Sequence, residues 1–288
     1  MRTTVPPGLA EQTEIEAYAD FAAGSPAPVR EALGIGSLRV GSALALAIRE
    51  DPSCFFNRAG GFGAGAPVTA DVLAPACGFY RDHGVPLGAL MVAPPLLPSD
   101  WAATAGQLNL TKGSRFTKLG CATEAALSAA DGVTALDSGL RIGPVEPRHA
   151  PEWATVMMTT FGFTAPGMTD MAASCVGRPN WRQYAVWESQ RIIAVGSIFV
   201  NGDCAGMFGA ATIPEGRGRG AQSALLTARA RAARAAGCRW LVAETGAEGP
   251  GDHNTSLQNM LRAGFQPLYD RVTWLWHAAG PEQEGRTQ

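Results

Sequence analysis

The chain has 288 residues, of which 46% are hydrophobic and 17% charged, and its formal net charge is −2. This composition indicates a folded globular protein, with enough residues for one large domain or two of ordinary size, and it excludes a disordered chain. The near-neutral charge gives no sign of a nucleic-acid-binding surface. No stretch reaches the roughly 18 apolar residues that a membrane helix needs, so no membrane contact is expected.

The six cysteines are scattered along the chain, at positions 54, 77, 121, 175, 204 and 238, and show no CxxC spacing. We therefore expect no metal site and no redox pair, and interpret the cysteines as small core residues in a reducing compartment. The first residues lack the apolar segment of a secretory signal, so the expected location is cytoplasmic.

The first half of the chain begins ambiguously. Residues 38–48 are either a strand or a buried helix, and residues 53–61 are strand-like and end in glycines. The later elements expected in this half are a helix at 69–82 interrupted by Pro75, a strand at 87–92, a helix at 98–108, a strand at 115–121, and a linker with a helical start at 123–138.

The second half is clearer. Its expected elements are a strand at 140–145, a helix at 147–161, a loop with a short helix at 162–180, strands at 182–187, 191–200 and 204–212, a helix at 221–236, a strand at 239–243, a helix at 254–263, and strands at 265–270 and 272–277. The order strand, glycine loop, helix, strand, helix, strand thus occurs twice, at about 55–121 and about 205–277, which predicts an internal duplication.

A glycine- and arginine-rich loop, PEGRGRG at 214–220, joins a strand directly to a helix. Gly218 and Gly220 permit positive φ and close approach of the backbone to a ligand. The first amides of the helix at 221–224 have no intrahelical acceptors, and the helix dipole favours an anion there by about 0.3–1 kcal/mol. Arg217 and Arg219 can add charge-assisted hydrogen bonds. The loop therefore predicts a phosphate site, and because its spacing is not GxGxxG, an NAD-type site is disfavoured.

Residues 139–277 resemble a GNAT-superfamily acyltransferase. Arg217 takes the Arg/Gln position that opens the family's pyrophosphate signature, and Gly220 takes its first required glycine. Gln222 departs from the pattern, because it stands where the family has glycine or alanine. In a second block, Asn254, Ser256, Asn259 and the Gly264-Phe265 pair fall as the family's last helix and strand require.

The resemblance implies an α/β fold of two GNAT-like domains in tandem, each a twisted, mostly antiparallel mixed sheet flanked by helices. The expected bounds are 1–135 for the first domain, 136–278 for the catalytic domain, and 279–288 for a disordered tail. The first domain has AGGFGAGAPVT in place of the loop, so it is expected to be degenerate and to wall the acceptor cleft. A second pocket for a ligand other than CoA is the alternative.

The resemblance also implies acetyl-CoA as the acyl donor, and no metal. In the family, the donor's pantetheine arm pairs with the strand before the loop like an added strand. That strand is residues 204–213 here. The residues expected to contact the donor are Ala211, Thr212, Ile213, Arg217, Gly218, Arg219, Gly220, Ala221, Gln222, Ser223, Asn254 and Asn259.

The implied reaction is direct attack of an amine on a thioester, which needs a proton acceptor and an acid for the leaving thiolate. Many relatives place a tyrosine acid where this chain has Met260, so Asn254, Ser256 or a water is expected to contact the sulfur. Asn254 is equally well placed to cap the last helix. Glu244, at the end of a buried strand, is the candidate base, with a structural role as its alternative. The other groups weighed as the base are Glu188, His253, Tyr269 and Asp270.

The predicted function is acyl-CoA-dependent N-acyl transfer to a small-molecule amine, with residues 160–180 covering the acceptor. Two alternatives stay open. The acyl group could come from the phosphopantetheine of an acyl carrier protein, or the chain could be a non-catalytic acyl-CoA sensor.

Overall fold

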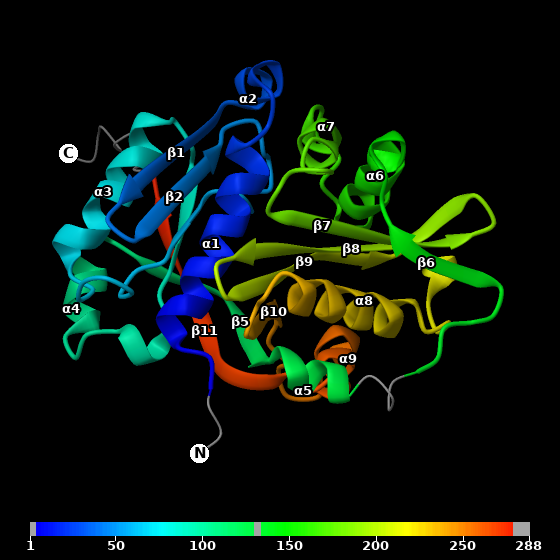
Figure 1. Ribbon diagram of the computed structural model, residues 1–288. Helices are drawn as coiled ribbons and strands as arrows, with labels where there is room; N and C mark the ends of the chain where they lie inside the picture. The colour runs from blue at the N-terminus through cyan, green and yellow to red at the C-terminus, as the bar shows by residue number, and fades with distance from the viewer. Residues whose placement is uncertain (1–3, 130–133, 279–288) are drawn as a thin grey trace.

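The computed structural model describes residues 4–129 and 134–278 (Figure 1). The expected disordered tail at 279–288 lies outside them. In the first half the elements are α1 (Pro7–Ala23), α2 (Ala27–Leu33), β1 (Ile35–Val40), β2 (Ala43–Ile48), β3 (Arg58–Gly60), α3 (Ala70–Asp82), β4 (Leu87–Met91), α4 (Trp101–Gln107), β5 (Thr111–Ala122) and α5 (Thr123–Ser128). In the second half they are β6 (Leu140–Pro144), α6 (Ala150–Phe161), α7 (Met168–Ala173), β7 (Trp181–Glu188), β8 (Arg191–Asn201), β9 (Cys204–Thr212), α8 (Ala221–Ala235), β10 (Trp240–Gly246), α9 (Thr255–Arg262) and β11 (Gln266–His277).

The segment at 38–48, expected as a strand or a buried helix, is strand: it is part of a hairpin, β1–β2, which turns at Gly41 with a φ of 60°. Two other expectations about elements were wrong. Only 58–60 of the strand expected at 53–61 is a strand, because the Asp51 carboxylate accepts the amides of Ser53 and Phe56 and holds the preceding residues in a turn. The two final strands are one strand, β11, with two register shifts. Helix α1 was not predicted.

All the strands described form one eleven-stranded sheet, ordered β1-β2-β3-β4-β11-β5-β10-β9-β8-β7-β6. The pairs β3/β4 and β9/β10 are parallel, and the other pairs are antiparallel. The two parallel pairs occupy corresponding places in the two halves, which agrees with the repeated order of elements seen in the sequence.

The last strand of each half lies among strands of the other half. Strand β11 lies between β4 and β5, and β5 lies between β11 and β10. Each half therefore has its sheet completed by the other. The domain bounds at 1–135 and 136–278 stay a prediction, but the hydrogen bonding joins the two segments into a single sheet.

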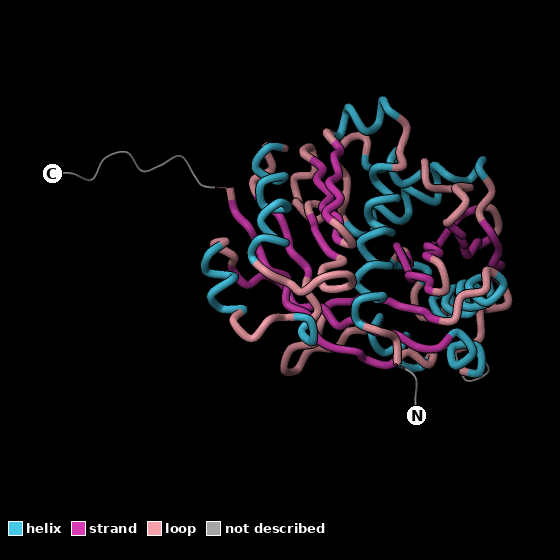
Figure 2. Tube along the Cα trace, turned by 60° about the vertical axis from the view of Figure 1, so that its left-hand side comes forward, coloured by secondary structure: helices cyan, strands magenta, loops and turns pink. Residues whose placement is uncertain are grey.

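Helices cover both faces of this sheet (Figures 1 and 2). On one face, α1, α6 and α7 share a core cluster with β2, β7 and β8. On the other face, α3 and α4 cover the first half, and α5, α8 and α9 cover the second. Helix α1 contacts β1, β2 and β3 as well as β8, β9 and β10, so it crosses the boundary between the halves. No helix in residues 4–129 and 134–278 has the length and apolar character to cross a membrane.

Candidate active site

Strands β9 and β10 diverge after a short parallel pairing. They pair only from Cys204 to Gly206, opposite Trp240 to Val242, although β10 stays paired with β5 as far as Gly246. A register shift between β8 and β9 accompanies Gly209, whose φ is 59°. A Cβ at Gly209 would lie 2.4 Å from the sulfur of Met157, so both backbone and space favour glycine here. The result is a wedge between residues 207–212 and 243–246 in which main-chain groups have no strand partner across the gap.

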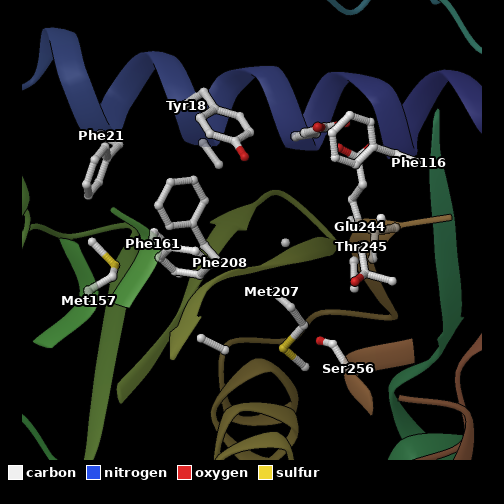
Figure 3. A pocket seen from close by; sticks show the side chains of 18 of the residues that line it. Tyr18, Phe21, Phe116, Met157, Phe161, Met207, Phe208, Glu244, Thr245 and Ser256 are labelled. Carbon is white, nitrogen blue, oxygen red and sulfur yellow. The ribbon is translucent and has the colours of Figure 1, made fainter. Parts of the chain in front are cut away.

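A cavity of about 610 Å³ passes through this wedge. It is bounded above by α1 and below by α8 and α9, and Glu244 and Thr245 of β10 lie along its side (Figure 3). Residues of both halves line it, so neither half forms the cavity alone. We call the part beside α8 and α9 the donor lobe and the part beside α1 and α6 the acceptor lobe, after the roles that the sequence predicts for them.

The loop at 214–220 has the backbone conformation that the sequence predicts. Gly218 and Gly220 have φ values of 74° and 77°, and Gly220 is the N-cap of α8. The amides of residues 218–223 donate to none of the described residues, whereas the Ala224 amide is the first to find an acceptor, the Gly220 carbonyl. A Cβ on Gly220 would lie 2.1 Å from the carbonyl oxygen of Ala135, so the segment before β6 packs directly against the loop.

The two loop arginines have different surroundings. The Arg219 guanidinium pairs with Asp137 at 3.0 Å and with Glu188 at 2.8 Å, so its charge holds the loop to the segment before β6 and to the end of β7. Arg217 is exposed and forms no ion pair with the described residues. The expectation that both arginines point at one anion therefore fits Arg217 better than Arg219.

Gln222 joins the start of α8 to the end of β9. Its Nε2 donates to the Thr212 hydroxyl at 2.7 Å, and its side chain lines the cavity. Ala211 is buried and faces the core on the α6 side of the sheet. Ile213 donates its amide to the Ile193 carbonyl and packs near Ala221. The cavity thus ends at Gln222, next to the loop.

The residues of the last helix have separate roles. The Asn254 side chain caps α9 by accepting the amides of Ser256 and Leu257. Its Nδ2 donates to Thr245 and Gly246 of β10, so all its hydrogen-bonding capacity is used in holding α9 and β10 together. Ser256 and Asn259 line the donor lobe, together with Met260. Ser223, at the start of α8, is not among the lining residues.

A buried group of ionised side chains, which we call the charged cluster, lies where the donor and acceptor lobes meet. It consists of Glu11, Glu14, Arg58, Lys118, Glu244 and Arg271. The Lys118 amine pairs with Glu14 and lies 3.3 Å from Glu244 and 3.8 Å from Glu11. Arg271 pairs with all three carboxylates. Three acids face three bases, so the cluster is neutral as a whole.

The cluster separates the pKa values of its carboxyl groups. Burial disfavours the charged form of Glu14, but the attraction of Arg271 and Lys118 outweighs burial and holds its pKa well below the usual range. Burial raises the pKa of Glu244 above its usual value, and the attraction of Arg271 only partly opposes this shift. Glu14 is therefore the permanent anion, and Glu244 is the better proton acceptor of the two.

The other groups weighed as a base lie elsewhere, and none of them lines the cavity. Glu188 pairs with Arg219, and His253 is exposed on the loop before α9. The Tyr269 hydroxyl donates to Glu11 at 2.8 Å, and Asp270 accepts from Thr117 at 2.7 Å. Of the residues considered, only Glu244 reaches the cavity.

Aromatic side chains wall the acceptor lobe, which the sequence interpretation largely missed. They are Tyr18, Phe21, Phe55, Phe56, Phe161, Phe163 and Phe208, with Met157 and Met158 between them. The Tyr18 and Phe208 ring centres are 5.1 Å apart, as are those of Phe55 and Phe163. Phe161 is 50% exposed at the rim. Figure 3 shows Tyr18 and Phe21 pointing down from α1 towards Phe208.

The wall is built from segments that the sequence does not connect. Residues 161 and 163 belong to the segment expected to cover the acceptor, but the opposite side comes from α1 and the 53–56 turn of the first half. One signal was available in α1: Glu11, Glu14, Tyr18 and Phe21 are spaced 3, 4 and 3 residues apart and so share a helix face.

Comparison with known proteins agrees with this geometry. Residues 151–265 match the model of the Acetyltransferase (GNAT) family. A GCN5-related N-acetyltransferase from Kribbella flavida superposes with a TM-score of 0.62 at 14% identity, over 95% of this chain and 96% of that one. A tandem GNAT protein from the clavulanic acid biosynthesis pathway superposes with a TM-score of 0.59 at 17% identity, over 97% and 99%.

A GCN5-related N-acetyltransferase from Sphaerobacter thermophilus gives a TM-score of 0.56 at 14% identity, over 96% of this chain and 95% of that one. No curated protein matches the chain. Residues 151–265 therefore carry the match to the GNAT family model, and the whole chain has the fold of a tandem GNAT protein.

Proposed function

We propose that the protein is an acyl-CoA-dependent N-acyltransferase, with acetyl-CoA as the reference donor and a small, mostly apolar amine as the acceptor. One observation carries the proposal. The wedge between β9 and β10 opens beside the unpaired amides at the start of α8, and a single cavity continues from there to the far face of the sheet.

The donor lobe suits an extended thioester arm. The diphosphate would bind the amides of residues 218–223, where the helix dipole and Arg217 favour negative charge. The arm would then run along the unpaired edge of β9 towards Gly209, as an added strand does. The Ser256 hydroxyl lines this lobe and is the group we propose to contact the sulfur, since the amide of Asn254 is used by the cap.

The acceptor lobe suits an amine with an apolar body. Its rings and thioethers offer apolar area and few hydrogen bonds, and its carboxylates lie at the inner end next to the wedge. A polycationic acceptor would leave most of its charge against aromatic carbon. The first half supplies α1 and the 53–56 turn, which fits its expected role as a wall.

The proposed chemistry follows from the difference between the two carboxyl groups. The amine nitrogen attacks the thioester carbon, the C–N bond forms as the C–S bond breaks, and the amine proton passes to Glu244, directly or through a water. Glu14 stays ionised beside Lys118 and Arg271, and these two cations also pair with Glu244 and hold it in place. The thiolate takes up a proton from solvent at the exposed end of the donor lobe.

One observation favours a second candidate. Met260 lines the donor lobe where many GNAT enzymes have a tyrosine acid, so the chain could bind acyl-CoA without turnover. A free-thiol assay with acetyl-CoA and a panel of amines separates the two. Thiol release that requires an amine supports the enzyme, whereas tight donor binding without release under any amine supports a sensor. If the donor is an acyl carrier protein, free thiol should be released only from the carrier-bound thioester and not from acetyl-CoA.

The donor site is tested by calorimetry with CoA on two variants of one position. Gly218 has a positive φ and open space around its Cβ, and both Asn and Asp tolerate this conformation. Gly218→Asp places a carboxylate at the proposed diphosphate site, so its dissociation constant for CoA should rise about tenfold or more above that of Gly218→Asn. Equal affinities in the two variants would contradict the loop assignment.

A further inference from the structure

We propose that Arg229 binds a carboxylate at the far end of the donor's acyl group, so that the preferred donor is a short dicarboxylic acyl-CoA of the malonyl or succinyl type. This inference rests on the proposed function and narrows its donor. It starts from a buried cation in the donor lobe that is not part of the charged cluster.

Arg229 is 1% exposed and lines the cavity. Its Nε donates to the Leu225 carbonyl at 3.1 Å, and its Nη1 donates to the Ser197 carbonyl at 3.4 Å. Its Nη2 donates to none of the described residues, and none of their carboxylates lies within ion-pair distance of the guanidinium. Arg271, also fully buried, pairs by contrast with three carboxylates.

An isolated buried charge is costly, and proteins normally pair it with an opposite charge. Burial lowers the pKa of Arg229 to about 10, so the guanidinium still carries its charge at neutral pH. Two main-chain carbonyls supply partial charge only. Because the side chain lines the cavity, an anion brought by a ligand can supply the missing partner.

The position of Arg229 identifies which part of the ligand it meets. Gln222, Leu226 and Arg229 are spaced i, i+4 and i+7 on α8, and all three line the cavity. The Cα of Arg229 lies eight residues beyond the start of the helix, which is about 12 Å along its axis. Its guanidinium bonds the carbonyls of Leu225 and Ser197, beyond the first turn, whereas the unpaired amides of the proposed diphosphate site end at residue 223.

The level of Arg229 along β9 points to the acyl end of the donor. Its partner Ser197 is opposite Phe208, next to the irregularity at Gly209. An arm that follows β9 from Thr212 would have its thioester at this level. Leu226 and Met207 line the same lobe and offer apolar contacts to the methylene groups between the thioester and a terminal carboxylate.

The acceptor is the other possible source of a carboxylate, but the geometry favours the donor. Arg229 extends from α8, which lies on the face of the sheet opposite to α1 and α6. The acceptor lobe is walled by α1 and α6, and its inner end already holds the charged cluster. The experiment below includes an arm for each source.

The test compares two donors that differ only in the terminal group of the acyl chain. Calorimetry on the full chain measures the dissociation constants of CoA, acetyl-CoA, butyryl-CoA and succinyl-CoA. The last two have the same number of acyl carbons and end in a methyl group and a carboxylate. We expect succinyl-CoA to bind about tenfold or more tightly than butyryl-CoA. Arg229→Met should abolish this preference and leave the affinity for CoA unchanged, and Arg229→Lys should keep part of the preference.

Arg229→Met exchanges a lone buried cation for an apolar chain of similar length, so it should fold, and its urea midpoint provides the check. A wild-type protein that binds butyryl-CoA and succinyl-CoA equally would overturn the inference, as would an undiminished preference in Arg229→Met. Phenylalanine and phenylethylamine are acceptors that differ in one carboxylate. If Arg229→Met raises the KM for phenylalanine but not the KM for phenylethylamine, Arg229 binds a carboxylate of the acceptor and the inference is wrong. Failure of CoA itself to bind would overturn the donor site, and this inference with it.

Discussion

Replacing Lys118 by methionine should lower the free energy of unfolding by about 3–5 kcal/mol, the usual effect of removing one partner from a buried ion pair. The lysine side chain is 1% exposed, and three carboxylates lie within 3.8 Å of its amine. Without it, the charged cluster has three carboxylates and only two cations, Arg58 and Arg271, so it carries one excess negative charge. The remaining negative charge lies among side chains that are almost wholly buried, so solvent screens it little and the free energy of unfolding should fall.

Urea unfolding followed by circular dichroism measures this loss, after reversibility has been checked. The matched control is Lys112→Met, because Lys112 lies on the same strand and is exposed; its effect should stay within about 0.5 kcal/mol. The double variant Lys118→Met with Glu244→Gln restores neutrality and should recover about 1–3 kcal/mol of the loss. Strict additivity of the two single effects would refute the idea that these charges act together.

The pH dependence has a definite sign. Glu244 has a raised pKa in the folded state, so its contribution to stability is present below its unfolded value of 4.5 and is lost as pH rises through the folded value. Removing Lys118 raises that pKa further, so the variant should become less stable than the wild type as the pH rises above 4.5, and the two should approach each other in acid. A loss of unfolding free energy that is the same at neutral pH and in acid would contradict the electrostatic explanation.

Three further predictions concern the wedge and the loop. Gly220→Ala should lower the free energy of unfolding more than Gly218→Ala. Both positions have positive φ, which costs alanine about 1–2 kcal/mol, but only a Cβ at Gly220 meets a backbone oxygen, at 2.1 Å. Equal urea midpoints of the two variants would rule out that contact. Gly209→Ala should lower kcat with little loss of CoA affinity, because its Cβ displaces the Met157 sulfur at the level of the thioester; an unchanged kcat would place the reaction elsewhere. Glu244→Gln should lower kcat/KM by about 10²–10⁴-fold. The wild-type kcat/KM should fall in acid at a pH above 4.5, because the pKa of Glu244 is raised, and this fall should be absent in the variant. A fall that persists in the variant would exclude Glu244 as the base.

Much of the donor side could be predicted from the sequence because its signals are local. The strand at 204–212 and the helix that follows the loop were found within one residue of their bounds, and Gly218 and Gly220 have the positive φ values that the loop requires. Hydrophobic periodicity and glycine positions depend on residues a few places apart, so one segment is enough to reveal them. Asn254 likewise caps the helix that its position suggests.

The acceptor side was found only in part. Residues 161 and 163 lie in the expected covering segment, but Tyr18 and Phe55 belong to the first half, where no local pattern distinguishes a cavity wall from ordinary core. Arg229 shares a sequence run with Arg231 and Arg234, so no local pattern marks it as buried. Its burial depends on packing against β8, where its partner Ser197 lies 32 positions away in the sequence.

By itself the sequence determined that a strand, a glycine- and arginine-rich loop and a helix follow one another, because each of these depends on contacts within a few residues. Only the tertiary structure decided that β5 and β11 complete each other's halves and that a neutral cluster of charges lies at the wedge. Lys118 and Glu14 are 104 positions apart, and Arg271 and Glu14 are 257 apart. Contacts over such distances form when the sheet closes, and no periodicity along the chain records them.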